Sequence, residues 1–289
     1  MIFLMLIKMT FKTTSAICFL AAAVLIFFSA MGMAADSLNF AVIQPGQPGT
    51  PEEAQPVMDA LAAHIQEKTG NGVVVRGAYF NQIEPALEFL CKEAPEWGII
   101  RLGFYSAHAR KFNMTPLAAT RPGGRNKDMW RLLVTREGPG DWKALTGRVR
   151  GNMLFEPAAA ACLLFGLPPD RLPFRLEGTF RPLRSVRDVI RGKIAGAVLD
   201  GVQYEAIQAL PSAEKMTVAH TSPDLPSSPV IWFGEMDDAA RQLRAILLSM
   251  KEDPDAKTLL KLLQTDGFGP ADPDLPGFRL ATNAAVCFP

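Results

Sequence analysis

Cysteine and histidine are scarce in this chain, which has 4 cysteines and 3 histidines among 289 residues. The histidines, His64, His108 and His220, lie far apart and show none of the short spacings of a metal site. We expect each of them to be a surface or packing residue, and we expect no metal.

Recognisable catalytic motifs are also missing. The sequence contains no nucleophile elbow, no P-loop and no dinucleotide-binding glycine pattern. Cys91 and Cys162 have no histidine close by in sequence. No basic stripe is interleaved with aromatic residues, so nucleic acid is not an expected partner. An enzyme is therefore the least favoured class, and no cofactor is expected.

Long apolar runs are confined to the N-terminus, where residues 16–30 follow two lysines and lead into small residues. This order predicts a secretory signal peptide over residues 1–34, cut before Ala35, with Met9 as an alternative start. The competing interpretation is an uncleaved membrane anchor. The small residues at the exit of the run favour cleavage.

The charges are balanced in number but not in position. The chain has 30 basic and 29 acidic residues, and residues 121–193 hold 15 of the basic and 7 of the acidic ones. A basic half can steer an anionic partner. Because the arginines are scattered along the sequence, a solvated basic face is the favoured interpretation.

Three cysteines remain after the predicted cleavage, which allows one disulfide and leaves one thiol in an oxidising compartment. Cys162 lies within "AAAACLLFGL" and is expected to be a buried helix residue. Cys91 and Cys287 are therefore the favoured disulfide pair.

Strands and helices alternate in the first part of the chain, which predicts a mostly parallel, helix-covered sheet. Thr50-Pro51-Glu52-Glu53 is a capping box with proline at the first helical position, and Gly70 ends that helix. Asn81 is the expected cap of the next helix. The predicted strands cover 38–44, 72–80, 97–105 and 116–120.

The pattern breaks at residues 121–125, "RPGGR", and then restarts as a second α/β unit. Asp141 is expected to cap a short helix there. The alanine-rich stretch from Glu156-Pro157 to Gly166 is expected to form a helix directly after a strand.

The order of these pieces resembles the phosphate, phosphite and phosphonate type of periplasmic substrate-binding proteins of ABC transporters. The resemblance is carried by the stretches "LNFAVIQPGQPGTPEEAQPVMDALAAHIQEKTG", "FNQIEPALEFL", "GIIRLGFYSAHAR", "DWKALTGRVRGNMLFEP", "LRSVRDVIRGKIAGAVLDGV", "SPDLPSSPVIWF" and "LLQTDGFGPADPDLPGF".

This resemblance implies a type 2 periplasmic-binding-protein fold with two α/β lobes, each a helix-covered mixed sheet, joined by two crossing segments. The first lobe is expected to consist of residues 36–120 and 217–289, and the second of residues 121–216. The return crossing is expected near 217–233, and the ligand in the cleft between the lobes.

The resemblance also implies which loops face the cleft, and it agrees with the rule that ligands of open α/β sheets bind beyond the carboxyl ends of strands. The ligand-binding residues that it predicts are Gln44, Gly46, Tyr79, Phe80, Tyr105, Ser106, Glu156, Ala158, Asp200 and Tyr204.

The helix start at Glu156-Pro157 departs from the serine, threonine and glycine residues that a phosphonate site favours. Pro157 lacks an N–H, and Glu156 would repel a phosphate if it faced the cleft. We therefore expect a neutral or cationic organic ligand rather than phosphate or a simple phosphonate. The alternative is that Glu156 only complements the helix dipole from the surface.

The sequence thus predicts a non-catalytic, periplasmic solute-binding protein, monomeric, that captures a small molecule for an ABC permease. The alternative is a ligand-sensing accessory protein for a membrane receptor or sensor kinase, or, less favoured, an enzyme on the same fold.

Overall fold

The computed structural model describes residues 36–70 and 72–275. The predicted signal peptide and its cleavage site lie outside these residues. Within them, no helix has the length and apolar character needed to cross a membrane.

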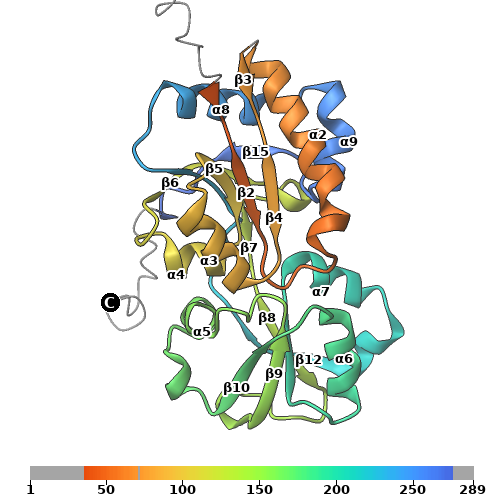
Figure 1. The fold of residues 1–289 in the computed structure, drawn as a ribbon. Helices are drawn as coiled ribbons and strands as arrows, with labels where there is room; N and C mark the ends of the chain where they lie inside the picture. The colour runs from red at the N-terminus through yellow and green to blue at the C-terminus, as the bar shows by residue number, and fades with distance from the viewer. Residues whose placement is uncertain (1–35, 71, 276–289) are drawn as a thin grey trace, which may run out of the picture. The chain divides into compact units, whose positions relative to one another are not determined.

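One sheet has six strands in the order β15-β6-β14-β5-β2-β4 (Figure 1). These strands are β2 (Phe40–Ile43), β4 (Gly77–Phe80), β5 (Trp97–Ile100), β6 (Met114–Thr120), β14 (Pro229–Phe233) and β15 (Phe268–Pro270). Strand β2 is parallel to β4 and β5, whereas β14 is antiparallel to both β5 and β6. The four strands from the first part of the chain, β2, β4, β5 and β6, run in the same direction, as predicted, and the sheet is mixed because β14 and β15 come back from the end of the chain.

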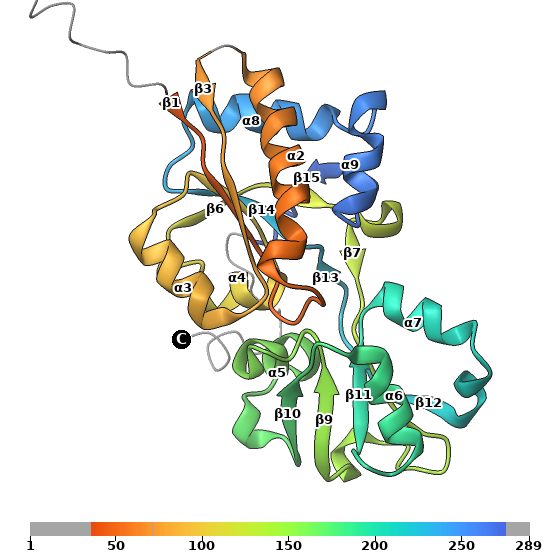
Figure 2. The ribbon, with the colours of Figure 1, turned by 45° about the vertical axis from the view of Figure 1, so that its right-hand side comes forward.

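Helices cover both faces of the six-stranded sheet. They are α2 (Pro51–Thr69), α3 (Ile83–Lys92), α4 (Leu102–His108), α8 (Asp238–Ser249) and α9 (Lys257–Leu262). Alternate residues of β2 face opposite ways: Phe40 and Val42 pack in the cluster of α2, α8 and α9, and Ala41 and Ile43 in that of α3 and α4. Both layers are visible in Figures 1 and 2.

The other sheet has five strands in the order β10-β9-β11-β8-β12. Its elements are β8 (Arg131–Thr135), β9 (Gly147–Gly151), α5 (Pro157–Phe165), β10 (Phe174–Gly178), α6 (Pro182–Ile190), β11 (Gly196–Leu199), α7 (Gly201–Gln208) and β12 (Met216–Thr221). Strands β9, β10 and β11 run parallel, and β8 is antiparallel to β11 and β12. Each lobe is thus a mixed, helix-covered sheet, as predicted.

Two segments connect the sheets. They contain the short strands β7 (Lys127–Asp128) and β13 (Leu225–Pro226), which pair antiparallel with each other (Figure 2). The predicted lobe boundaries remain a prediction. The strand pairing bears on one of them, because β12 belongs to the five-stranded sheet and the chain returns to the six-stranded sheet only after Thr221.

Local sequence signals set several element ends. Thr50 and Glu53 form the predicted capping box at the start of α2, and Gly70 follows its end with a φ of 99°. Asp141 caps a short 3-10 helix over Trp142–Ala144. Asn81 does not cap a helix: its side-chain amide donates to the carbonyls of Gln47 and Gly49, and α3 begins after Gln82.

The predicted disulfide between Cys91 and Cys287 is wrong, because Cys91 is an exposed free thiol on α3. Cys287 lies outside the described residues. Cys162 is a buried residue of α5, as expected, but it is disulfide-bonded. No distance between the cysteines can be read from a sequence, and the choice between them depended only on the apolar surroundings of Cys162.

Candidate functional site

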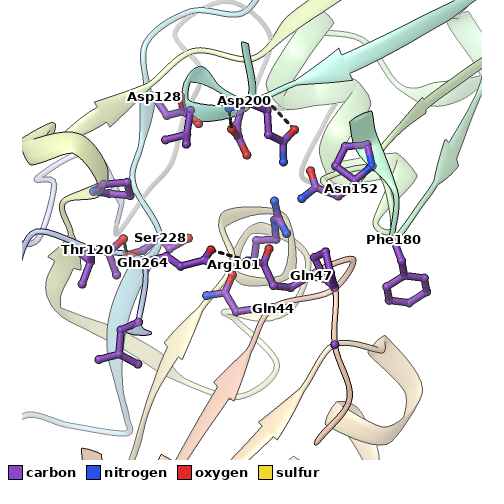
Figure 3. A pocket seen from close by; sticks show the side chains of 18 of the residues that line it. Gln44, Gln47, Arg101, Thr120, Asp128, Asn152, Phe180, Asp200, Ser228 and Gln264 are labelled. Atoms are coloured by element: carbon purple, nitrogen blue, oxygen red, sulfur yellow. Dashed lines mark hydrogen bonds between the residues drawn. The ribbon is translucent and has the colours of Figure 1, made fainter. Parts of the chain in front are cut away.

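A cavity of about 1130 Å³ opens between the two lobes (Figure 3). Four of its polar lining residues are each the first residue after a strand: Gln44 after β2, Arg101 after β5, Asn152 after β9 and Asp200 after β11. Strand ends from both sheets therefore converge on one space, which is where open α/β folds bind their ligands.

Arg101 contributes a positive charge to this cavity. Its Nη1 donates to the carbonyl of Pro45 at 3.0 Å, and its side chain makes no ion pair with any described residue. Burial lowers the pKa of Arg101 from its ordinary value, and the nearby charge of Asp200 acts in the opposite direction. A guanidinium has five N–H donors and stays charged, so several donors are left for a ligand.

Asn152 faces the same cavity from the second lobe. The residue is 1% exposed, and its Oδ1 has no hydrogen-bond partner among the described residues. Figure 3 shows the Asn152 side chain pointing into the cavity toward which Arg101 also points. A buried amide without partners is costly unless a ligand or water completes its hydrogen bonds.

Two carboxylates, Asp128 and Asp200, line the same space. Asp200 accepts the N–H of Gln203 at 2.8 Å and caps α7, while Asp128 accepts the N–H groups of Gly201 and Met129, both at 2.8 Å. Burial raises the pKa of both groups, and the charge of Asp200 raises that of Asp128 further. Their backbone contacts give both residues a structural role.

The first lobe also contributes Tyr79 and Gln47. Burial raises the pKa of Tyr79 to about 12, so its phenol is a neutral hydrogen-bonding group at ordinary pH. Gln47 donates through Nε2 to Oε1 of Gln264 at 2.7 Å, which connects two loops that line the cavity.

The structure brings three of the predicted ligand-binding residues, Gln44, Tyr79 and Asp200, to the cavity wall. The other seven are not part of that wall. Phe80 packs on Phe89. The other six predicted residues outside the wall are Gly46, Tyr105, Ser106, Glu156, Ala158 and Tyr204.

Contacts elsewhere account for several of these residues. Tyr105 and Ser106 lie on α4 rather than on a loop, and their hydroxyls donate to the carbonyls of Leu275 and Leu102. The guanidinium of Arg131 lies over the ring of Tyr204, 4.5 Å from its centroid.

Glu156, on which our expectation about ligand charge depended, contacts another part of the protein. Its Oε1 lies 2.7 Å from Nε2 of His108, which is at the end of α4 in the first lobe. The pair is only 17% and 16% exposed. Because Glu156 does not line the cavity, repulsion by its carboxylate no longer supports a neutral or cationic ligand.

Arg101 and Asn152 were missed because the predicted strands were too long. We expected one strand over 97–105, but β5 ends at Ile100 and α4 begins at Leu102. A charged residue directly after the buried run "WGII" was the available signal for Arg101, and a polar residue after "GRVRG" was the signal for Asn152.

No cluster of three or more His, Cys, Asp or Glu side chains within residues 36–70 and 72–275 is arranged to hold a metal ion.

A family model described as "ABC transporter, phosphonate, periplasmic substrate-binding protein" matches residues 49–275. No curated protein sequence matches the chain.

Solved structures resemble the whole fold at low sequence identity. A Xanthomonas citri protein bound to ATP has a TM-score of 0.65 at 19% identity, covering 87% of this chain and 97% of its own. The binding protein component of an ABC phosphonate transporter from Pseudomonas aeruginosa has a TM-score of 0.61 at 14% identity, covering 87% of each chain. PhnD1 from Prochlorococcus marinus, in complex with methylphosphonate, has a TM-score of 0.57 at 11% identity, covering 83% of this chain and 94% of its own.

Proposed function

Because the chain belongs to the phosphonate-type family of periplasmic substrate-binding proteins of ABC transporters, we propose that it captures an organic solute that carries an oxyanion. Arg101 and Asn152 hold that group in the cleft. The ligand is released to a membrane permease, and closure of the lobes about β7 and β13 is the capture step.

The observation that carries the proposal is that the guanidinium of Arg101 faces the cavity without an ion-pair partner among the described residues. Arg101 is half-buried and has no carboxylate in hydrogen-bonding contact, which is unfavourable unless an anion joins it. A phosphoryl or carboxylate group matches its planar set of donors, and the amide of Asn152 can donate to the same group from the opposite lobe.

The size of the cavity supports an organic solute rather than a bare ion. Cavities of about 300–1,000 Å³ hold drug-sized molecules, and this one has about 1130 Å³. Tyr79, Phe180 and Leu183 are among the residues that supply apolar surface around the polar groups. The methylphosphonate of the Prochlorococcus protein and the ATP of the Xanthomonas protein both carry oxyanions, which agrees with this choice.

The location and assembly of the protein follow from the same premise. We propose that residues 1–34 direct export and are removed, and that the protein acts as a periplasmic monomer. N-terminal sequencing of protein recovered from the periplasm, together with its mass in solution, tests both points.

Calorimetry with methylphosphonate and 2-aminoethylphosphonate tests the proposed ligand class. We expect Arg101→Met to weaken binding about a hundredfold, because it removes a charge and a bidentate contact. Arg101→Lys keeps the positive charge but loses the bidentate contact, so its affinity should lie between those of the wild-type protein and Arg101→Met.

Arg110→Met is the matched control, since Arg110 is exposed and outside the cavity wall. Equal affinities for Arg101→Met and Arg110→Met, with both variants folded, would overturn the proposal. Preferential binding of a cationic compound would also overturn it.

A further inference from the structure

A second, smaller cavity lies in the second lobe, where β10 leads into α6. Its volume is about 210 Å³, and its wall consists of Arg150, Thr179, Arg181, Arg184, Ser185 and Asp188. All of these side chains are polar or charged. A space of this size suits a small ion or a single charged group rather than a whole organic solute.

The start of α6 gives this cavity a positive electrostatic character. Arg181 precedes the helix and provides no side-chain cap, and Pro182 occupies the first helical position. The N–H groups of Arg184 and Ser185 already donate to the carbonyl of Arg181, so the helix dipole is what makes this helix start attractive to anions. A helix start alone is common, so the other groups decide what the cavity can bind.

Besides the helix start, the side chain of Ser185 also points to a ligand in this cavity. It is only 2% exposed, it lines the cavity, and its hydroxyl makes no hydrogen bond with any described residue. A buried hydroxyl usually finds a partner, because leaving it unpaired costs free energy. The hydroxyl can donate to an oxyanion, and the arginines of the same wall can donate to it as well.

The charges of the wall favour an anion. The side chains of Arg181 and Arg184 form no ion pair with any described residue. Arg150 donates through Nε to Glu177 at 2.9 Å, which leaves its terminal amino groups available. Asp188 opposes an anion, and Glu177 offsets the charge of Arg150, so Arg181 and Arg184 supply the excess positive charge of the wall.

We infer that this cavity is a second binding site, for a tetrahedral oxyanion such as a phosphate group, held by Ser185, Arg184 and Arg181. The site uses neither Arg101 nor Asn152, so it does not depend on the function proposed above. Arg181, Arg184 and Asp188 line both cavities. The oxyanion is therefore either a free inorganic ion or a second anionic group of a molecule in the main cleft.

The test is a titration with inorganic phosphate, followed by backbone NMR in the Arg101→Met background, where the main cleft is disabled. We expect amide shifts at Thr179 and Ser185. We expect about tenfold weaker binding in Arg184→Gln, and a loss of several-fold in Ser185→Ala.

Arg175→Gln is the matched control: it removes the same charge from β10, and Arg175 lines neither cavity. If Arg184→Gln and Arg175→Gln bind phosphate with equal affinity, the inference is wrong. The same holds if phosphate shifts no amide around α6. Both results are independent of what Arg101→Met does to phosphonate binding.

A parallel titration with methylenediphosphonate separates the two sources of the oxyanion. If its affinity falls in both Arg101→Met and Arg184→Gln, one ligand spans the cavities. If Arg101→Met leaves the phosphate site unchanged and the diphosphonate gains nothing over phosphate, the site serves a free ion. Either result supports a site at α6.

Discussion

In the second lobe, the N-termini of α5 and α6 are built alike but differ in what occupies the space in front of them. Both α5 and α6 follow a strand and a short turn, have proline at the first helical position and lack a side-chain cap. At α5 the space is filled by the protein itself, because Glu156 pairs with His108 of the first lobe. At α6 a cavity remains, with an unpaired hydroxyl and free guanidinium groups. The same backbone motif can thus hold two parts of the chain together or stay open for a ligand.

The largest expected effect comes from disturbing the close contact between Gly46 and the residues just before α5. Gly46 has a φ of 83°, and a Cβ there would lie 2.2 Å from the carbonyl oxygen of Asn152 and 2.7 Å from the ring of Phe155. We expect Gly46→Ala to destabilise the closed protein by at least about 2–3 kcal/mol, through backbone strain and this clash. Urea unfolding measures the loss, and small-angle scattering shows whether the lobes separate.

Gly49→Ala is the control for that change. Gly49 has a φ of 100°, and the nearest atom to its Cβ would be Oε2 of Glu53 at 3.3 Å. This variant therefore carries backbone strain without the contact to the second lobe. Equal losses in the two variants would show that the close approach to α5 contributes nothing.

The second expected effect concerns the covalent tie of α5, which α6 lacks. Reduction should remove the disulfide of Cys162 and destabilise the protein by about 2–4 kcal/mol. In the unreduced, denatured protein, a thiol reagent should label Cys91 and leave Cys162 unlabelled. Peptide mapping checks the labelling, and modification of Cys162 without reduction would contradict it.

A smaller effect is expected from the contact between Glu156 and His108 itself. Glu156→Gln should cost about 1 kcal/mol, because the pair with His108 is largely shielded from water. Glu88→Gln is its counterpart, since Glu88 pairs with Lys92 on α3 at 66% and 65% exposure. That variant should change stability less than Glu156→Gln does, because water screens the exposed pair. Chemical denaturation of both variants tests whether shielding distinguishes the two pairs.

The smallest effect should have the opposite sign. Arg184 places a positive charge in the first turn of α6, where the helix dipole disfavours it. Arg184→Gln should therefore raise the free energy of unfolding by a few tenths of a kcal/mol in anion-free buffer. A loss of stability in that buffer would mean that the arginine has a structural partner.

Much of the fold was predictable because alternating burial and caps are local. Thr50, Asp141 and Gly166 mark element ends in sequence and in structure. The position of β14 was not predictable in this way, since a buried run such as "PVIWF" does not reveal which strands it will separate.

The site was only partly predictable for a related reason. Gln44 and Asp200 were expected at the ends of predicted strands, each one residue beyond the observed end of β2 or β11. Arg101 was hidden within a run of "WGIIRLGFY" that suits a strand throughout, although the chain turns into α4 after Ile100. The side chain of Glu156 contacts His108, 48 residues earlier in the chain, instead of the cavity. No local pattern reports such a contact.

The place of β14 between β5 and β6 has a consequence for the order in which the protein can fold. The five-stranded sheet is made from one continuous stretch, 131–221, and can form as soon as that stretch is available. The six-stranded sheet must wait for residues 229–233, although β2, β4, β5 and β6 all precede residue 121. Until then β5 and β6 present open, apolar edges that invite pairing with other chains. The lobe whose strands are mostly synthesised first is therefore completed last, and it is the lobe that most needs protection from aggregation during folding.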